Sequence, residues 1–299
     1  MKKVFKNICR MTQMEVKSYG YEELSKTHDK VIVGDGFVYA EGNFPVLLVA
    51  HMDTVHKKLP KKISDVDGVI SSANGIGGDD RCGIYMVLQI VKKVNCSVLF
   101  CEDEEIGAVG AEKFINTDLA QDLIGKFNYI MEFDRKGDKD AVFYECDNAD
   151  FEKFITKEYY KSAYGSFSDI STLAPFLEVA AVNLSCGYYQ AHTKNEYVVW
   201  DEMQTSIGKA IKILNRTTEE DKFKYIPAPI TLHGNYSYDY GYYGYGAFCY
   251  EVYYISHNGD YKVYETLADT ELEAIALFCI EHPDLTYGHI IETVCLDDM

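Results

Sequence analysis

His51 and Asp53 lie two residues apart and come directly after a short apolar run, Pro45–Ala50. This run begins with a proline and is rich in valine and leucine, which predicts a buried strand that ends at the histidine. A neutral imidazole binds a metal ion through one nitrogen, while its other N–H needs an acceptor that fixes the ring. The pair therefore offers a metal ligand and a carboxylate to orient it, although a loop histidine taken alone is more often an ordinary polar residue.

Four further groups of potential ligands follow along the chain, each predicted at the end of a strand or in the loop beside it. They are Asp79-Asp80, Glu104-Glu105, Asp134 and His192, the last followed four residues later by Glu196. Taken singly, the aspartate pair could cap a helix, and the glutamate pair could be solvated acids at a helix start, where the dipole favours them. Because such explanations would have to hold for every group at once, the complete set favours a metal site.

The elements expected to position these residues are strands that alternate with helices. Strands are predicted at 45–50, 96–101, 129–133, 141–145 and 179–184, hairpins at 30–42 and 63–72, and helices within 1–28 and at 81–94, 109–117, 150–161, 170–176 and 201–215. The candidate ligands follow the carboxyl ends of strands or lie in adjoining loops. This order is typical of an open α/β sheet whose site lies along the carboxyl edge.

The composition changes after Asn215, and this change predicts two domains, residues 1–215 and 216–299. A charged stretch is followed by two prolines, at 227 and 229, and then by a Tyr/Gly-rich run over 236–254. The remainder predicts strands at 248–256 and 261–265, a helix at 270–281 and a strand through 290–291, which is a small α+β domain. We interpret the tyrosine run as a strand and loop packed on the main body rather than as a stacking surface for a ligand or sugar.

Composition and charge exclude several classes of protein. The chain has 299 residues, 47% hydrophobic and 25% charged, as expected for a soluble globular protein. Its net charge of −18 argues against nucleic acid or an anionic membrane surface as a partner. No run approaches the ~18 apolar residues of a membrane span, and no signal peptide is expected. The nine scattered cysteines, including Cys82, Cys96 and Cys101, predict reduced core thiols in a cytoplasmic protein.

The set of motifs resembles that of the co-catalytic zinc exopeptidases, the clan of tripeptidase, the zinc aminopeptidases and the acetylornithine and succinyl-diaminopimelate deacylases. The matching segments are His51–Val55, Gly78–Gly83, Asp103–Gly107, Asp134 and His192, with Arg81 where lysine is usual. The resemblance covers about residues 1–215. It implies a three-layer α/β/α fold with a mixed, mostly parallel sheet. The intervals 51–79 and 134–192 leave no room for the lid domain that many members carry.

The resemblance also implies a ligand set for two metal ions. Asp79 would bridge both ions, His51 and Asp134 would complete one site, and Glu105 and His192 would complete the other. Three carboxylates and two imidazoles would neutralise much of the charge of the ion pair and leave positions open for water. Two Zn²⁺ ions suit this set best, with Co²⁺ or Mn²⁺ as alternatives.

Catalytic roles follow from the same resemblance. Asp53 would orient His51, and Glu104 would be the general base that takes a proton from the attacking water. Glu104 must not itself be a ligand, because a coordinated carboxylate cannot carry that proton to the leaving amine. Without a lid, a donor to the oxyanion must come from elsewhere. The candidates for substrate contacts are Tyr164, Ser168, Tyr188 and Tyr189.

We therefore expect a hydrolase that cleaves a peptide bond in small peptides and resembles an aminopeptidase. One alternative keeps the fold and changes the substrate: an N-acyl-amino-acid deacylase or a carboxypeptidase-like amidohydrolase, which would recognise a free carboxylate through Arg or Lys. A second alternative is a non-catalytic protein whose C-terminal domain binds a partner or carbohydrate. Sequence alone assigns neither an oligomeric state nor a role for residues 216–299.

Overall fold

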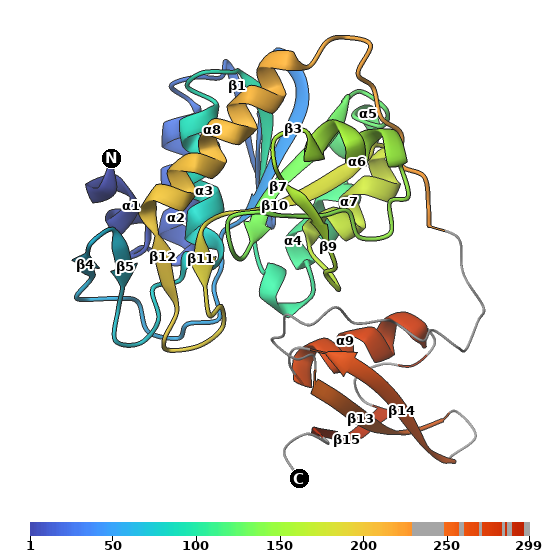
Figure 1. The fold of residues 1–299 in the computed structure, drawn as a ribbon. Coiled ribbons are helices and arrows are strands. Elements are labelled where there is room, and N and C mark those ends of the chain that lie inside the picture. The colour runs from blue at the N-terminus through green and yellow to red at the C-terminus, as the bar shows by residue number, and fades with distance from the viewer. Residues whose placement is uncertain (229–247, 257–259, 269–270, 283–284, 286–288, 296–299) are drawn as a thin grey trace. The chain divides into compact units, whose positions relative to one another are not determined.

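In the computed structural model the chain forms two compact units, residues 1–229 and 230–299 (Figure 1). The structure describes residues 1–228, 248–256, 260–268, 271–282, 285 and 289–295. Most of the Tyr/Gly-rich run lies outside these residues, so its interpretation stays a prediction.

The first unit is built on an eight-stranded sheet. Its strands lie in the order β1 (Lys30–Gly34), β2 (Phe37–Glu41), β6 (Cys96–Cys101), β3 (Phe44–His51), β7 (Tyr129–Arg135), β10 (Ala181–Ser185), β8 (Asp140–Val142) and β9 (Lys161–Ala163). The four central strands, β6, β3, β7 and β10, are parallel to one another. Their residues are almost all buried, because central parallel strands are covered on both faces.

Helices cover both faces of this sheet and give it three layers (Figure 1). One side carries α1 (Lys2–Ile8), α2 (Gln13–Leu24), α3 (Gly78–Ile90), α6 (Ala149–Thr156) and α8 (Trp200–Arg216), and the other carries α4 (Val109–Ile115), α5 (Asp118–Asp122) and α7 (Asp169–Leu177). Alternate residues of β3 therefore belong to two cores: Leu48 faces the first and Val49 the second. None of the helices in the described part of the chain is both long and apolar enough to cross a bilayer.

A second, smaller sheet joins two loops that are far apart in the sequence. Its antiparallel strands lie in the order β11 (Tyr188–Tyr189), β12 (Tyr197–Val199), β5 (Val69–Ser71) and β4 (Ser64–Val66). The interval 51–79 holds only the short β4–β5 hairpin, and the interval 134–192 is filled by strands and helices of the first unit. The three-layer fold with a mixed, mostly parallel sheet and no inserted lid domain is therefore confirmed.

The first unit extends beyond the predicted boundary at 215/216. The N–H of Phe223 donates to the carbonyl of Asn128 at 2.8 Å, and the N–H of Ala180 donates to the carbonyl of Phe223 at 3.0 Å. Isolated bridges pair Lys224 with Val179 and Pro227 with Cys146. This segment is polar and charged in sequence and was predicted to belong to the second domain. Its backbone is paired to the first unit, which ends at Pro229.

The second unit contains a three-stranded antiparallel sheet and one helix in its described part. The strand order is β14 (Tyr261–Ala268), β13 (Phe248–Ile255), β15 (Ile290–Cys295), and the helix is α9 (Glu271–Glu281). Alternate residues of β13, Tyr250, Val252 and Tyr254, form an apolar cluster with Phe278 of α9. This is the small α+β arrangement that the sequence predicts.

The cysteines whose side chains the structure describes contribute packing rather than cross-links. Seven cysteines in the described part of the chain are free thiols, and six of these are buried. Cys82, Cys96 and Cys101 have no exposed surface. They therefore behave as small apolar core residues.

Two helical glycines allow a test of how closely α3 approaches the sheet. A Cβ atom on Gly83 would lie 2.0 Å from the backbone oxygen of Phe133 on β7, whereas a Cβ on Gly208 in α8 would meet nothing within 4 Å. Gly83→Ala should therefore lower the free energy of unfolding by about 1–3 kcal/mol, because α3 must move away from β7. Gly208→Ala should raise it by about 0.5–1 kcal/mol, because alanine favours the helix. Urea unfolding measures both, and equal or greater stability of Gly83→Ala would contradict the close packing.

Candidate active site

The candidate ligands meet along the carboxyl edge of the central sheet. His51 is the last residue of β3, and Asp134 lies near the end of the neighbouring parallel strand β7. Glu104 and Glu105 lie in the 3-10 helix η1 (Glu104–Ile106), which follows β6 on the other side of β3. Asp79 lies in the first turn of α3. Parallel strands end at the same edge, and α3 begins there too, so four separate segments bring their polar side chains to one place.

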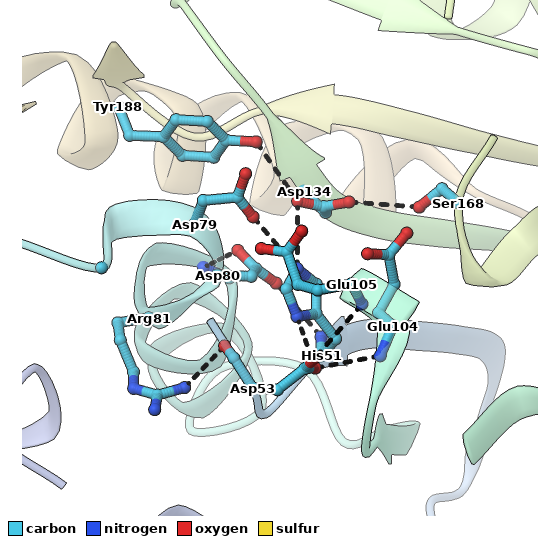
Figure 2. Close-up of polar contacts among 12 residues, drawn as sticks. His51, Asp53, Asp79, Asp80, Arg81, Glu104, Glu105, Asp134, Ser168 and Tyr188 are labelled. Atoms are coloured by element: carbon cyan, nitrogen blue, oxygen red, sulfur yellow. Dashed lines mark hydrogen bonds and ion pairs between the residues drawn. The ribbon is translucent and has the colours of Figure 1, made fainter. Parts of the chain in front are cut away.

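The Asp79 carboxyl group lies between the imidazoles of His51 and His192, and Figure 2 shows the contact with His51. Its Oδ1 is 3.0 Å from Nε2 of His51, and its Oδ2 is 3.2 Å from Nε2 of His192. The same His192 nitrogen is 3.0 Å from Oε2 of Glu105, and Nε2 of His51 is 3.5 Å from Oδ1 of Asp134. All five predicted ligands are therefore together, in two halves that share the carboxyl group of Asp79.

Charge is concentrated in this group. Burial opposes ionisation of Asp79, yet the imidazoles of His192 and His51 hold the pKa of its carboxyl well below its usual range. Burial would lower the pKa of His192, but the carboxylates of Asp79 and Glu105 outweigh burial and raise it to about 11. Burial and the nearby Asp79 raise the pKa of Asp134 to about 6 against the opposing effect of His51. In the absence of metal ions, the positive charge of the protonated imidazoles thus compensates the negative charge of the carboxylates. Bound cations could supply the same compensation.

Asp53 fixes both His51 and the following glutamates. Its Oδ1 accepts from Nδ1 of His51 at 3.0 Å and from the backbone N–H of Glu104 at 3.0 Å, and its Oδ2 accepts from the N–H of Glu105 at 3.1 Å. Burial would raise the pKa of Asp53, but His51 and these N–H groups outweigh it and lower the pKa. The ring of His51 is therefore held through Nδ1, with Nε2 directed to Asp79 and Asp134.

Arg81 is buried and stabilises the loop that carries Asp53. Its Nη1 donates to the backbone carbonyls of Met52 and Asp53, and its Nη2 donates to that of Met11 at 3.2 Å. The side chain is 1% exposed. The planar guanidinium reaches carbonyls of two segments at once, which a single ammonium group does less well.

Asp80, unlike its neighbour Asp79, accepts hydrogen bonds from backbone N–H groups. Its Oδ1 accepts from the N–H of Gly83 at 2.8 Å, and its Oδ2 accepts from the N–H of His51 at 3.2 Å. One Asp80 oxygen also lies within 4.8 Å of ligand atoms of His51 and Asp134. Because its carboxyl group already connects the start of α3 to the end of β3, Asp79 is the better candidate to bridge two ions.

Two of the predicted substrate contacts touch a candidate ligand instead of open space. The Tyr188 hydroxyl donates to Oδ1 of Asp134 at 3.2 Å (Figure 2). The Ser168 hydroxyl lies 3.2 Å from Oδ2 of Asp134 and 2.6 Å from Oε2 of Glu132. Both side chains are buried. In this structure the hydroxyls of Ser168 and Tyr188 therefore orient Asp134.

The other two predicted contacts lie differently. The Tyr189 hydroxyl donates to Glu202 at 2.6 Å, and its ring stacks on Tyr197 with centroids 5.2 Å apart. Tyr164 is 83% exposed. Neither placement tests a role in substrate binding, and for both residues that role stays a prediction.

Two buried acids behind Asp134 are not among the site residues predicted from the sequence. Glu132 lies on β7 and Asp169 at the start of α7, and neither has exposed surface. Within the described structure, neither oxygen of Asp169 accepts a hydrogen bond from an N–H or O–H group, and the polar group against it is the thiol of Cys101. Burial raises the pKa of Asp169 to about 7. A charged residue within the apolar strand 129–133 was a visible signal for Glu132, whereas Asp169 resembled an ordinary helix-start acid.

Comparisons with known proteins support the fold. No protein-family model matches the chain, and no curated protein sequence does. Aminopeptidase PepT from Bacillus cereus is similar in structure, with a TM-score of 0.60 and 14% identity over 71% of this chain and 96% of that one. An aminopeptidase from Desulfurococcus kamchatkensis has a TM-score of 0.57 and 15% identity over 73% and 95%. A tripeptidase from Staphylococcus aureus has a TM-score of 0.57 and 13% identity over 70% and 95%. At these identities, the similarity shows a shared fold.

Asp169 should make the stability of the metal-free protein depend on pH. Its pKa of about 7 in the folded chain exceeds the unfolded value of about 3.9, so between these values only the folded chain holds the proton. The free energy of unfolding should therefore fall as pH rises from about 4 to about 7. Asp169→Asn should make this decrease shallower in urea unfolding of chelator-treated protein. The exposed Asp29 offers a control, Asp29→Asn, and an unchanged slope in Asp169→Asn would contradict the assignment.

Proposed function

We propose that this chain is a metal-dependent hydrolase that cleaves a peptide bond of small peptides with a free amino terminus, through water activated at two divalent ions. The observation that supports this most directly is the position of the Asp79 carboxyl group, with one oxygen against His51 and the other against His192. A carboxylate with one oxygen for each of two histidines is suited to bridging two cations.

The residues present fit a metal pair. Each half of the group offers one imidazole nitrogen and one carboxylate, His51 with Asp134 and His192 with Glu105, and both share Asp79. Oε1 of Glu105 is buried and has no hydrogen-bond partner among the described residues, so it is free to bind. Imidazole with carboxylate suits Zn²⁺ best, with Co²⁺ and Mn²⁺ as alternatives.

Glu104 is the group suited to moving protons. Two ions held by the neighbouring ligands would supply Lewis acidity and lower the pKa of water toward ~7. The backbone N–H of Glu104 donates to Asp53. Figure 2 shows the carboxyl groups of Glu104 and Glu105 directed the same way, away from Asp53. Burial keeps the pKa of the Glu104 carboxyl well above its usual value in the absence of cations. In that position the carboxylate can accept a proton from water and return it to the leaving amine.

Two observations favour a peptide with a free amino terminus as the substrate. The similar solved structures are described as aminopeptidases and a tripeptidase. A deacylase would need a cation for the free carboxylate of its substrate. Arg81, which directly follows the aspartate pair, is buried and donates to backbone carbonyls, so it is not available for that contact.

Replacing the proposed base should abolish turnover without removing metal. Glu104→Gln keeps the size of the side chain but cannot accept a proton, so kcat should fall about 10²- to 10⁴-fold. Metal content, measured by mass spectrometry, should stay at the wild-type level. Glu102→Gln is a matched control, because Glu102 lies two residues away and pairs with Lys17 at 3.1 Å. A metal-loaded Glu104→Gln that keeps the wild-type rate on every substrate would contradict the mechanism.

Metal dependence and substrate class can be tested together. Chelation should abolish hydrolysis, and about two Zn²⁺ per chain should restore it. Unblocked dipeptides and tripeptides should be cleaved, whereas N-acetylated peptides and N-acyl amino acids should not. Cleavage of the N-acyl amino acids alone would favour the deacylase, and two bound ions with no hydrolysis of either library would favour a non-catalytic protein.

A further inference from the structure

Glu196 is a buried carboxylate beside the candidate metal site for which the proposed chemistry has no use. It lies between β11 and β12, four residues after His192, and its side chain has no exposed surface. Its Oε2 accepts from the N–H of Gly77 at 2.7 Å and lies 2.6 Å from Nε2 of His56, and its Oε1 accepts from the N–H of Asp79 at 3.0 Å. Burying a carboxylate is costly unless such donors satisfy it.

The backbone N–H groups at the start of α3 need acceptors from outside the helix. Gly77, the N-cap of α3, has a left-handed conformation and no side-chain cap, and Asp79 and Asp80 have non-helical dihedral angles. The first N–H groups of a helix have no partner within the helix. Glu196 accepts from two N–H groups at this terminus, and the positive end of the helix dipole favours its charge.

One loop therefore holds Asp79 from two sides. The ring of His192 contacts Oδ2 of Asp79, and Glu196 accepts from its N–H. Within the loop, the N–H of Glu196 donates to the carbonyl of Thr193 at 3.2 Å. The loop also accepts from the other segment, because the N–H of Gly75 donates to the carbonyl of Lys194 at 2.9 Å. Hydrogen bonds between the loop of His192 and the segment of Asp79 thus set the position of Asp79 relative to His192.

His56 completes the arrangement from the loop that follows β3. Its ring packs against Gly75, where a Cβ atom would lie 2.1 Å from the ring carbon Cε1. Because a carboxylate only accepts hydrogen bonds, Nε2 of His56 donates to Oε2 of Glu196. The carboxylate is therefore fixed by donors from two segments, the loop at His56 and the start of α3.

We propose that Glu196 is a positioning residue for the metal pair: its carboxylate sets the backbone of Asp79 so that the Asp79 carboxyl group can serve both halves of the site. This inference rests on the proposed function, because it assumes that two ions bind there. It adds a role that the ligands and Glu104 do not have. A purely structural carboxylate would affect folding stability, whereas a positioning residue must also affect how the metal pair binds.

Metal titration of Glu196→Gln tests this role. The amide places an NH₂ group where one oxygen accepted a backbone N–H, so Gly77 or Asp79 loses its acceptor. We expect the folded variant to bind Zn²⁺ about 10- to 100-fold more weakly in at least one site by calorimetry. The visible absorption spectrum of the variant titrated with Co²⁺ should also differ from that of wild type, because the ligand geometry around Asp79 changes.

A matched control separates positioning from stability. Glu158 is partly buried and pairs with Arg216. Glu158→Gln should change the unfolding midpoint but leave Zn²⁺ affinity and the Co²⁺ spectrum at wild-type values. Glu196→Asp, a second test variant, keeps the charge but is one methylene shorter, so it cannot reach both Gly77 and Asp79. It should weaken metal binding in the same direction as Glu196→Gln.

The outcomes are distinguishable. Wild-type Zn²⁺ affinity and Co²⁺ spectrum in a folded Glu196→Gln or Glu196→Asp would overturn the inference and leave the proposed function standing. If the wild-type protein itself bound neither Zn²⁺ nor Co²⁺, the proposed function would fail, and the role of Glu196 with it. Weaker binding in both variants, with unchanged binding in Glu158→Gln, would establish the role.

Discussion

The contact of one carboxyl group with two imidazoles is the interaction on which the rest of this site depends. His51 comes from the end of a central strand, His192 from a loop more than a hundred residues later, and Asp79 from the start of a helix between them. Each Asp79 oxygen meets a different ring. Such a contact requires three segments to be fixed independently, and the surrounding hydrogen bonds of Asp53, Asp80 and Glu196 do this.

The site also gathers carboxyl groups that water would otherwise solvate. Asp80, Glu132, Asp134 and Asp169 are largely buried near His51, and burial raises the pKa of each. In a medium of low dielectric constant such groups either hold protons or need cations nearby. A pair of divalent ions would lower these pKa values and stabilise the ionised forms. The acids behind the ligands therefore favour the binding of cations at this edge of the sheet. Without cations, their ionisation is unfavourable.

The small sheet of β11, β12, β5 and β4 explains how a fold without an inserted lid domain organises its loops. It pairs the hairpin that precedes Asp79 with the strands that flank His192, so backbone hydrogen bonds fix the two loops against each other. Tyr188, on β11, then reaches Asp134 on the main sheet. Side chains that could have faced a substrate are used here to hold the ligands.

The sequence by itself was enough to predict the α/β sheet with a site along its carboxyl edge, and the resemblance of its motifs to those of the co-catalytic zinc exopeptidases implied that His51, Asp79, Glu105, Asp134 and His192 meet there. Apolar runs followed by polar residues mark parallel strand ends, and parallel strands end at one edge. Tertiary structure alone decided that Ser168 and Tyr188 contact Asp134, that Glu196 binds the N–H of Asp79, and that the first unit continues to Pro229. These outcomes depend on which distant loops meet and which backbone groups they leave unpaired, and local sequence patterns carry no record of either.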